Sequence, residues 1–204
     1  MNKSHEIAKD LLDIKAVQIN TRQYFTWTSG IKSPIYCDNR LTMSFPNVRE
    51  KIVQAFVQKI EAMPVKPDVI AGCATAGIPH AAWLAGELGL PMVYVRSAPK
   101  GHGKGNQIEG LIEAGQRVVL IEDLISTGGS VIESAHALQK AGAEVLHILA
   151  IFTYGLEKSK QLFLREDLSF ETITNYDELL NYLEKNNEIT HVEKKELEIW
   201  RNNL

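Results

Sequence analysis

The stretch that decides the fold covers residues 118–130 and reads VVLIEDLISTGGS. Its first four residues are all aliphatic, which is typical of a short strand buried on both faces of a parallel sheet. The two acids that follow, Glu122 and Asp123, are expected where this strand emerges from the sheet. A loop of glycine and hydroxyl residues over 126–130 then leads into a helix expected from Val131 to Ala141.

This order of elements predicts a binding site for a phosphorylated sugar. Small residues let backbone N–H groups come close to an anion, and the start of a helix adds positive partial charge. The carboxylates of Glu122 and Asp123 can accept hydrogen bonds from adjacent hydroxyls of a polyol such as ribose. A structural turn with two solvated acids is the alternative. A Walker B strand would look similar, but the chain has no Gly-x-x-x-x-Gly-Lys-Ser/Thr motif to accompany it.

Two further loops of small or cationic residues follow expected strands. Residues 68–72 predict a strand that runs into loop 73–77, ahead of a helix that ends near Gly89. Residues 91–96 predict the next strand, which leads into residues 97–110. Glycines alternate with basic residues in this second loop: Lys100, Gly101, His102, Gly103, Lys104 and Gly105. We expect a mobile lid that closes on pyrophosphate, because glycine makes an ordered resting loop costly in entropy. An ordinary solvated loop is the alternative.

The alternation of strands and helices from residue 68 to 152 predicts an α/β fold with a mainly parallel, doubly wound sheet. Ligands in such sheets bind beyond the carboxyl ends of the strands, so loops 73–77, 97–110 and 126–130 should meet at one edge. The other expected elements are helices over 5–17, 47–61, 157–164, 176–186 and 191–202, strands over 144–152 and 169–174, and a short antiparallel pair within 23–40. Thr190 and Glu193 have the spacing of a capping box for the last helix.

The bulk composition narrows the class of protein. The chain has 204 residues and a net charge of −3, with no long basic run, which argues against nucleic acid as a partner. No uninterrupted apolar run approaches the roughly 20 residues of a membrane helix. The two cysteines, Cys37 and Cys73, form no Cys-x-x-Cys motif and are expected to be reduced thiols rather than zinc ligands. We expect a single-domain cytoplasmic protein without a membrane segment.

Two motifs carry a resemblance to a known family. Residues 118–130 closely resemble the phosphoribosyl-pyrophosphate (PRPP) signature of type I phosphoribosyltransferases. Residues 25–36 read FTWTSGIKSPIY, which is close to the pattern Phe-Thr-x-x-Ser-Gly-x-x-Ser-Pro-x-Tyr of the orotate phosphoribosyltransferases within that class. The resemblance covers about residues 5 to 202. It implies the type I fold, with a small hood from about residues 1–40 and part of 153–204 over a core of about 41–152.

The resemblance also implies roles for individual residues. The acid pair would hold the ribose hydroxyls, the loop after it the 5′-phosphate, loop 73–77 the pyrophosphate, and the hood the base. The implied PRPP-binding residues are Thr75, Ala76, Gly77, Arg96, Lys100, His102, Glu122, Asp123, Leu124, Ile125, Ser126, Thr127, Gly128, Gly129 and Ser130. Lys100, His102, Glu122 and Asp123 would be catalytic, and Ser126, Tyr36 and Cys37 would contact orotate.

The implied reaction is magnesium-dependent transfer of the 5-phosphoribosyl group from PRPP to orotate, in UMP synthesis. Magnesium would ride mainly on PRPP, without direct protein ligands, and the lid would reach across a homodimer. One branch of the family has lysines where this chain has Thr28, Ala76 and Ser97, and an arginine near Tyr154, so the present site has fewer cations. The alternatives are a purine-type transferase and a non-catalytic PRPP-sensing regulator. The hood-like segment 23–40 argues against the first, and the lack of a convincing DNA-binding helix-turn-helix argues against the second.

Overall fold

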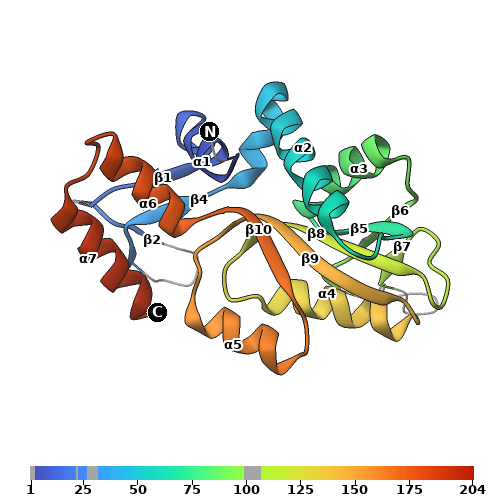
Figure 1. Ribbon diagram of the computed structural model, residues 1–204. Helices are drawn as coiled ribbons and strands as arrows, with labels where there is room; N and C mark the ends of the chain where they lie inside the picture. The colour runs from blue at the N-terminus through green and yellow to red at the C-terminus, as the bar shows by residue number, and fades with distance from the viewer. Residues whose placement is uncertain (1–2, 22, 27–31, 99–106) are drawn as a thin grey trace.

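The computed structural model describes residues 3–21, 23–26, 32–98 and 107–204, and its centre is a six-stranded sheet with helices on both faces (Figure 1). The strand order is β10-β9-β8-β5-β6-β7. Neighbouring strands are parallel except at the edge, where β7 runs antiparallel to β6. The strands are β5 (Val69–Cys73), β6 (Met92–Val95), β7 (Ile108–Glu109), β8 (Arg117–Ile125), β9 (Glu144–Thr153) and β10 (Phe170–Asn175). The predicted mainly parallel, doubly wound α/β fold is confirmed.

The aliphatic run of β8 supplies both hydrophobic cores. Side chains alternate across a strand, so Val119 and Ile121 join one buried cluster while Val118 and Leu120 join the other. Helices α2 (Pro46–Ala62) and α3 (Gly77–Leu88) cover the first face, and α4 (Gly129–Lys140) and α5 (Glu157–Arg165) cover the second (Figure 1). Burial on both faces explains why this strand is an unbroken apolar run rather than an alternating one.

The two ends of the chain lie together at one end of the sheet (Figure 1). The N-terminal part holds α1 (Lys3–Asp13) and two small antiparallel pairs, β1 (Val17–Ile19) with β4 (Ile35–Cys37) and β2 (Phe25–Thr26) with β3 (Lys32–Ser33). The C-terminal part holds α6 (Tyr176–Lys185) and α7 (His191–Asn202). Trp200 Nε1 donates to the Lys32 carbonyl at 3.3 Å, and Thr21 Oγ1 donates to Glu193 at 3.2 Å. These contacts between the N-terminal and C-terminal parts are needed for the expected hood. The division of the chain into hood and core stays a prediction.

Three boundaries differ from the sequence-based expectation. The helix expected over 5–17 ends at Asp13, because Lys15 has a positive φ of 60° and Val17 pairs with Cys37 in β1. A 3₁₀ helix, η1 (Asn39–Ser44), follows β4 and was not expected. The segment 97–110 is not all loop, since Ile108 is buried and β7 pairs with β6.

The position of the acid pair also differs from the sequence-based expectation. The strand expected to end at Ile121 continues to Ile125, because β9 goes on pairing with it through Glu122↔Ala150 and Leu124↔Phe152. Glu122 and Asp123 therefore lie inside β8 rather than beyond its end. Their backbone is held by one neighbouring strand, and this rigidity bears directly on the site.

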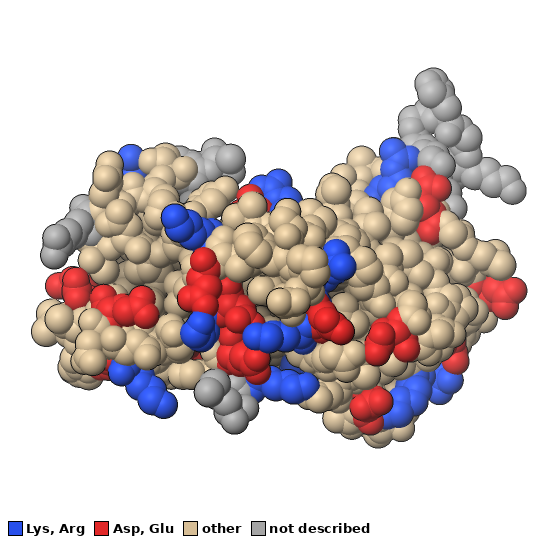
Figure 2. Space-filling view, turned by 90° about the horizontal axis from the view of Figure 1, so that it is seen from above, with Lys and Arg blue, Asp and Glu red and all other residues tan. Residues whose placement is uncertain are grey.

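Two observations concern the described helices and the charge on one face of the molecule. None of the helices within the described ranges combines the length and hydrophobicity needed to cross a bilayer. On the face seen in Figure 2, acidic and basic side chains are interspersed, and neither sign forms one continuous patch.

Candidate active site

A cavity of about 400 Å³ opens beyond the end of β5, and it gathers residues from three separate segments, 37–40, 74–76 and 122–130. Its lining residues are Cys37, Asp38, Arg40, Ala74, Thr75, Ala76, Glu122, Asp123, Leu124 and Ser130. The loop after β5, the acid pair and the start of α4 thus meet at one edge of the sheet, as predicted for two of the three loops. The third loop is described only at residues 97–98 and 107–110.

The acid pair lines this cavity, with Glu122 buried and Asp123 half-buried. Glu122 is 7% exposed, and its Oε1 accepts a hydrogen bond of 2.9 Å from the backbone N–H of Asp123. Burial, and then the neighbouring charge of Asp123, raise the pKa of Glu122 well above its ordinary value. Burial also raises the pKa of Asp123. Two desolvated carboxyl groups side by side favour a ligand that donates hydrogen bonds or brings positive charge.

The segment after β4 brings an ion pair to the same cavity. Asp38 caps η1 by accepting from the Arg40 N–H at 3.3 Å, and it also accepts from Arg40 Nε at 2.6 Å and Nη2 at 3.0 Å. The hydrogen bond from Arg40 lowers the pKa of Asp38. Arg40 is the one lysine or arginine among the described residues that line the cavity. Sequence reasoning missed Asp38, Asn39 and Arg40, although a polar run directly after the apolar strand residues was a usable signal.

Two glycines occupy crowded positions at the starts of α3 and α4. A Cβ on Gly77 would lie 2.4 Å from the Ile121 carbonyl oxygen, so only glycine lets the start of α3 rest against β8. Gly128 has a φ of 89°, and a Cβ there would also meet the Phe163 ring at 2.7 Å. Within the described residues, no side chain caps α3 or α4 at its N-terminus. Both helix starts therefore present backbone N–H groups suited to an anion.

Other predicted residues are not part of this lining or lie outside the described residues. Arg96 follows β6 and forms an ion pair with Glu109 at 3.7 Å, away from the described lining. Tyr36 is 39% exposed and packs on the Phe25 ring at 5.8 Å. Ile125 is fully buried, so only its backbone can reach a ligand. Among the residues of the 126–130 loop, Ser126 is half-buried and Thr127 is exposed. Lys100, His102 and Thr28 lie outside the described residues.

The oxygen donors of the cavity suit a hard cation such as magnesium, but they do not form a ready-made cage. Asp38, Glu122 and Asp123 supply carboxylate oxygens, the ligand type that magnesium prefers. Within the described ranges, no three His, Cys, Asp or Glu side chains are grouped as metal ligands. A magnesium ion here would take most of its ligands from the substrate and water.

The comparisons with known proteins agree with this geometry. The phosphoribosyl transferase domain family matches residues 44–174. The orotate phosphoribosyltransferase of Oceanobacillus iheyensis is 62% identical over 204 residues, covering all of both chains. The chain belongs to the orotate phosphoribosyltransferase family. Another member of this family, from Listeria monocytogenes, is 55% identical over all of this chain and 97% of its own length.

Solved structures confirm the type I phosphoribosyltransferase fold. The orotate phosphoribosyltransferase from Aeropyrum pernix superposes with a TM-score of 0.76 at 29% identity, over 90% of this chain and 99% of that one. The Leishmania donovani UMP synthase gives a TM-score of 0.79 at 30% identity, over 97% of this chain and 42% of that one. The orotate phosphoribosyltransferase fold is therefore also found as part of a longer chain.

Proposed function

We propose that the protein transfers the 5-phosphoribosyl group from PRPP to orotate, releasing pyrophosphate and forming orotidine 5′-phosphate for UMP synthesis. The observation that carries this proposal is the cavity itself. It joins the acid pair, a small-residue loop and the start of α4 within one space of about 400 Å³. These three features together match the hydroxyls and the two phosphorylated ends of the PRPP sugar.

In the proposed complex, each part of PRPP meets a different element. Glu122 and Asp123 accept hydrogen bonds from the ribose hydroxyls, and residues 126–130 bind the 5′-phosphate at the start of α4. Loop 73–77 binds the pyrophosphate, together with Arg96, Lys100 and His102. Tyr36, Cys37 and Ser126 contact the orotate ring.

The proposed reaction needs positioning rather than a side-chain nucleophile. The bond from the ribose anomeric carbon to pyrophosphate breaks, a bond from that carbon to an orotate nitrogen forms, and this nitrogen gives up its proton to the released pyrophosphate or to water. Positive charge develops on the ribose ring and negative charge on the leaving group, so the acid pair stabilises the first and the cations stabilise the second. Magnesium carried by PRPP supplies further positive charge at the pyrophosphate.

Arg40 can supply positive charge that lysines supply in one branch of the family. Its guanidinium has five N–H donors, of which two bind Asp38. The other three have no hydrogen-bond partner within the described ranges of the chain and can donate to phosphate oxygens, in a cavity whose other described charged residues are acids. We infer that Arg40 takes over part of the role that lysines at positions 76 and 97 play elsewhere in the family.

The remaining parts of the proposal concern the oligomeric state and the cellular compartment. We propose a homodimer in which the lid over residues 97–110 serves the neighbouring subunit. We also propose a cytoplasmic enzyme, which agrees with Cys37 and Cys73 both being free thiols.

The decisive assay follows the loss of orotate absorbance with and without PRPP in the presence of magnesium. Asp123→Asn keeps the side-chain size but removes the charge. We expect a lower turnover that corresponds to a loss of about 2–4 kcal/mol of transition-state stabilisation. Exposed Asp13→Asn serves as the matched control. Full turnover in Asp123→Asn contradicts the assigned role. A panel of purine bases tests the alternative transferase, and a gel-shift assay tests the regulator.

A further inference from the structure

Strand β8 loses one of its neighbours where the acid pair begins. Strand β5 pairs with β8 as far as Gly72↔Ile121 and then ends at Cys73. The Ile121 carbonyl faces the backbone of Gly77, where a Cβ would lie only 2.4 Å away. Carbonyls two residues apart on a strand point to the same side. The Asp123 carbonyl therefore points to the side where β5 has already ended and has no strand to bind it.

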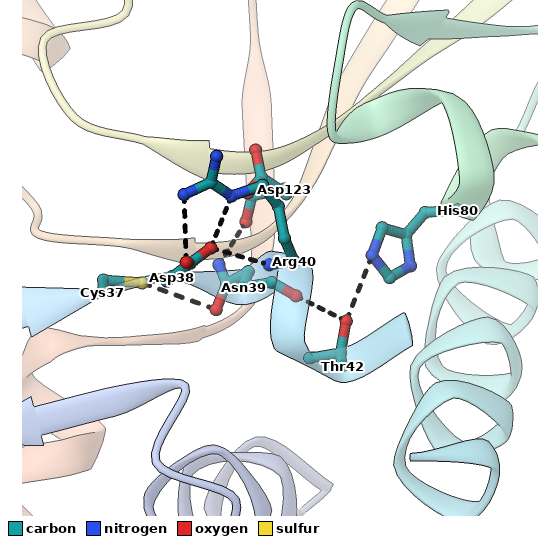
Figure 3. A network of polar contacts seen from close by, with 7 residues as sticks. All are labelled: Cys37, Asp38, Asn39, Arg40, Thr42, His80 and Asp123. Atoms are coloured by element: carbon teal, nitrogen blue, oxygen red, sulfur yellow. Dashed lines mark hydrogen bonds and ion pairs between the residues drawn. The ribbon is translucent and has the colours of Figure 1, made fainter. Parts of the chain in front are cut away.

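The side chain of Asn39 occupies that position. Asn39 Nδ2 donates a hydrogen bond of 2.7 Å to the Asp123 carbonyl, from a residue 84 positions earlier in the chain (Figure 3). Because a carbonyl can only accept, this contact fixes which end of the amide faces β8. Asn39 is fully buried, so its amide has no alternative partner in bulk water.

The other end of the same amide faces the base side of the site. Asn39 Oδ1 accepts from Cys37 Sγ at 3.4 Å, and Figure 3 shows Asn39 lying between Cys37 and Asp123. The Asn39 backbone is held in turn, since its carbonyl accepts from Thr42 Oγ1 at 2.6 Å. Thr42 Oγ1 also contacts His80 Nε2 at 3.3 Å, which ties η1 to α3. The buried amide of Asn39 thus links Cys37, at the end of β4, to Asp123 in β8.

We propose that Asn39 is a positioning residue that sets the Asp123 peptide, and with it the Asp123 carboxylate, relative to Cys37. This inference rests on the proposed function, in which Asp123 holds ribose and Cys37 contacts orotate. Asn39 is fully buried and is not among the lining residues of the cavity, so its role would be exerted through Asp123 and Cys37. Its loss leaves a buried carbonyl unsatisfied and lets the peptide rotate.

The kinetic consequence is specific. PRPP is held mainly through its phosphates, which lie on other loops, so a shifted Asp123 should change PRPP affinity little. The alignment of ribose and base should suffer instead, since a displacement of about 1 Å can cost up to roughly 10²-fold in rate. A positioning role therefore predicts a loss in kcat that is much larger than the change in KM for PRPP.

The test compares Asn39→Leu with Thr42→Val. Leucine matches the shape of asparagine but neither donates nor accepts, whereas Thr42→Val breaks the supporting bonds and leaves the Asn39 amide in place. We expect Asn39→Leu to lower kcat about tenfold or more with KM for PRPP changed less than about threefold. Thr42→Val should lose stability with a much smaller loss of kcat than Asn39→Leu. If both variants lose kcat in proportion to their lost stability, Asn39 is merely structural and the inference is wrong.

A double-mutant cycle separates this inference from the proposed function. If Asn39 acts through Asp123, adding Asn39→Leu to Asp123→Asn should lower kcat little further. Independent, multiplying losses overturn the positioning role while leaving the proposed function intact. A fully active Asp123→Asn refutes the proposed function instead. Should Asn39→Leu fail to fold, Asn39→Ala removes the same donor with a smaller side chain, and the same comparisons apply.

Discussion

Replacing Gly77 with alanine is expected to damage both stability and PRPP binding. The added Cβ would lie 2.4 Å from the Ile121 carbonyl oxygen, whereas ordinary contact begins at 3.4 Å, so about 1 Å must be absorbed. The obstacle is backbone of a central strand and cannot rotate away. Overpacking of this kind typically costs about 1–3 kcal/mol of unfolding free energy. We expect the net loss to lie in that range, and urea denaturation measures it.

The same displacement should reach the ligand site. Loop 74–76 leads directly into α3, so moving the start of this helix moves the loop away from Glu122 and Asp123 in the shared cavity. A shift of about 1 Å at a positioning element can cost up to roughly 10²-fold. We therefore expect Gly77→Ala to raise KM for PRPP by about tenfold or more in the orotate absorbance assay.

Gly86→Ala is the matched control on the same helix. A Cβ on Gly86 meets nothing within 4 Å, so the substitution adds only the helix propensity of alanine. It should stabilise the protein by about 0.5–1 kcal/mol and leave KM unchanged. If Gly77→Ala proves as stable and as active as Gly86→Ala, the close approach of α3 to β8 does not hold the site together.

Three further outcomes are expected. Arg40→Ala should raise KM for PRPP more than KM for orotate, unlike exposed Arg165→Ala, and equal effects of the two variants in steady-state kinetics would remove Arg40 from the site. Burial lowers the pKa of His80 from 6.5 to about 4. As pH falls through that window the unfolded chain gains a proton that the folded chain refuses, so stability should drop by about 3 kcal/mol relative to His80→Gln. Parallel urea-stability curves for these two proteins would exclude a neutral buried His80. Glu122 has a raised pKa, so its ionisation penalises the fold increasingly as pH rises above 4.5. Glu122→Gln should therefore be more stable than the parent near about pH 8, with the gap shrinking toward about pH 5; a gap independent of pH in urea titrations would argue against it.

Signals that act within a few residues were readable from the sequence. The aliphatic run at 118–121 predicted a doubly buried strand, and the spacing of Thr190 and Glu193 predicted the capping box that the structure contains. The alternation of strands and helices predicted the parallel sheet and the edge where its loops meet. The motifs at residues 118–130 and 25–36 also indicated the family, because they depend only on residues close together in the chain.

Contacts between distant segments were decided only by the tertiary structure. Strand β8 runs past the acid pair because β9 continues beside it. Helix α1 ends earlier than expected because Val17 pairs with Cys37 of β4. The bond from Asn39 to Asp123 joins segments 84 residues apart and depends on where β5 happens to end. Local propensity and periodicity are properties of neighbouring residues, whereas register and strand length are settled by which partner is present to satisfy the backbone.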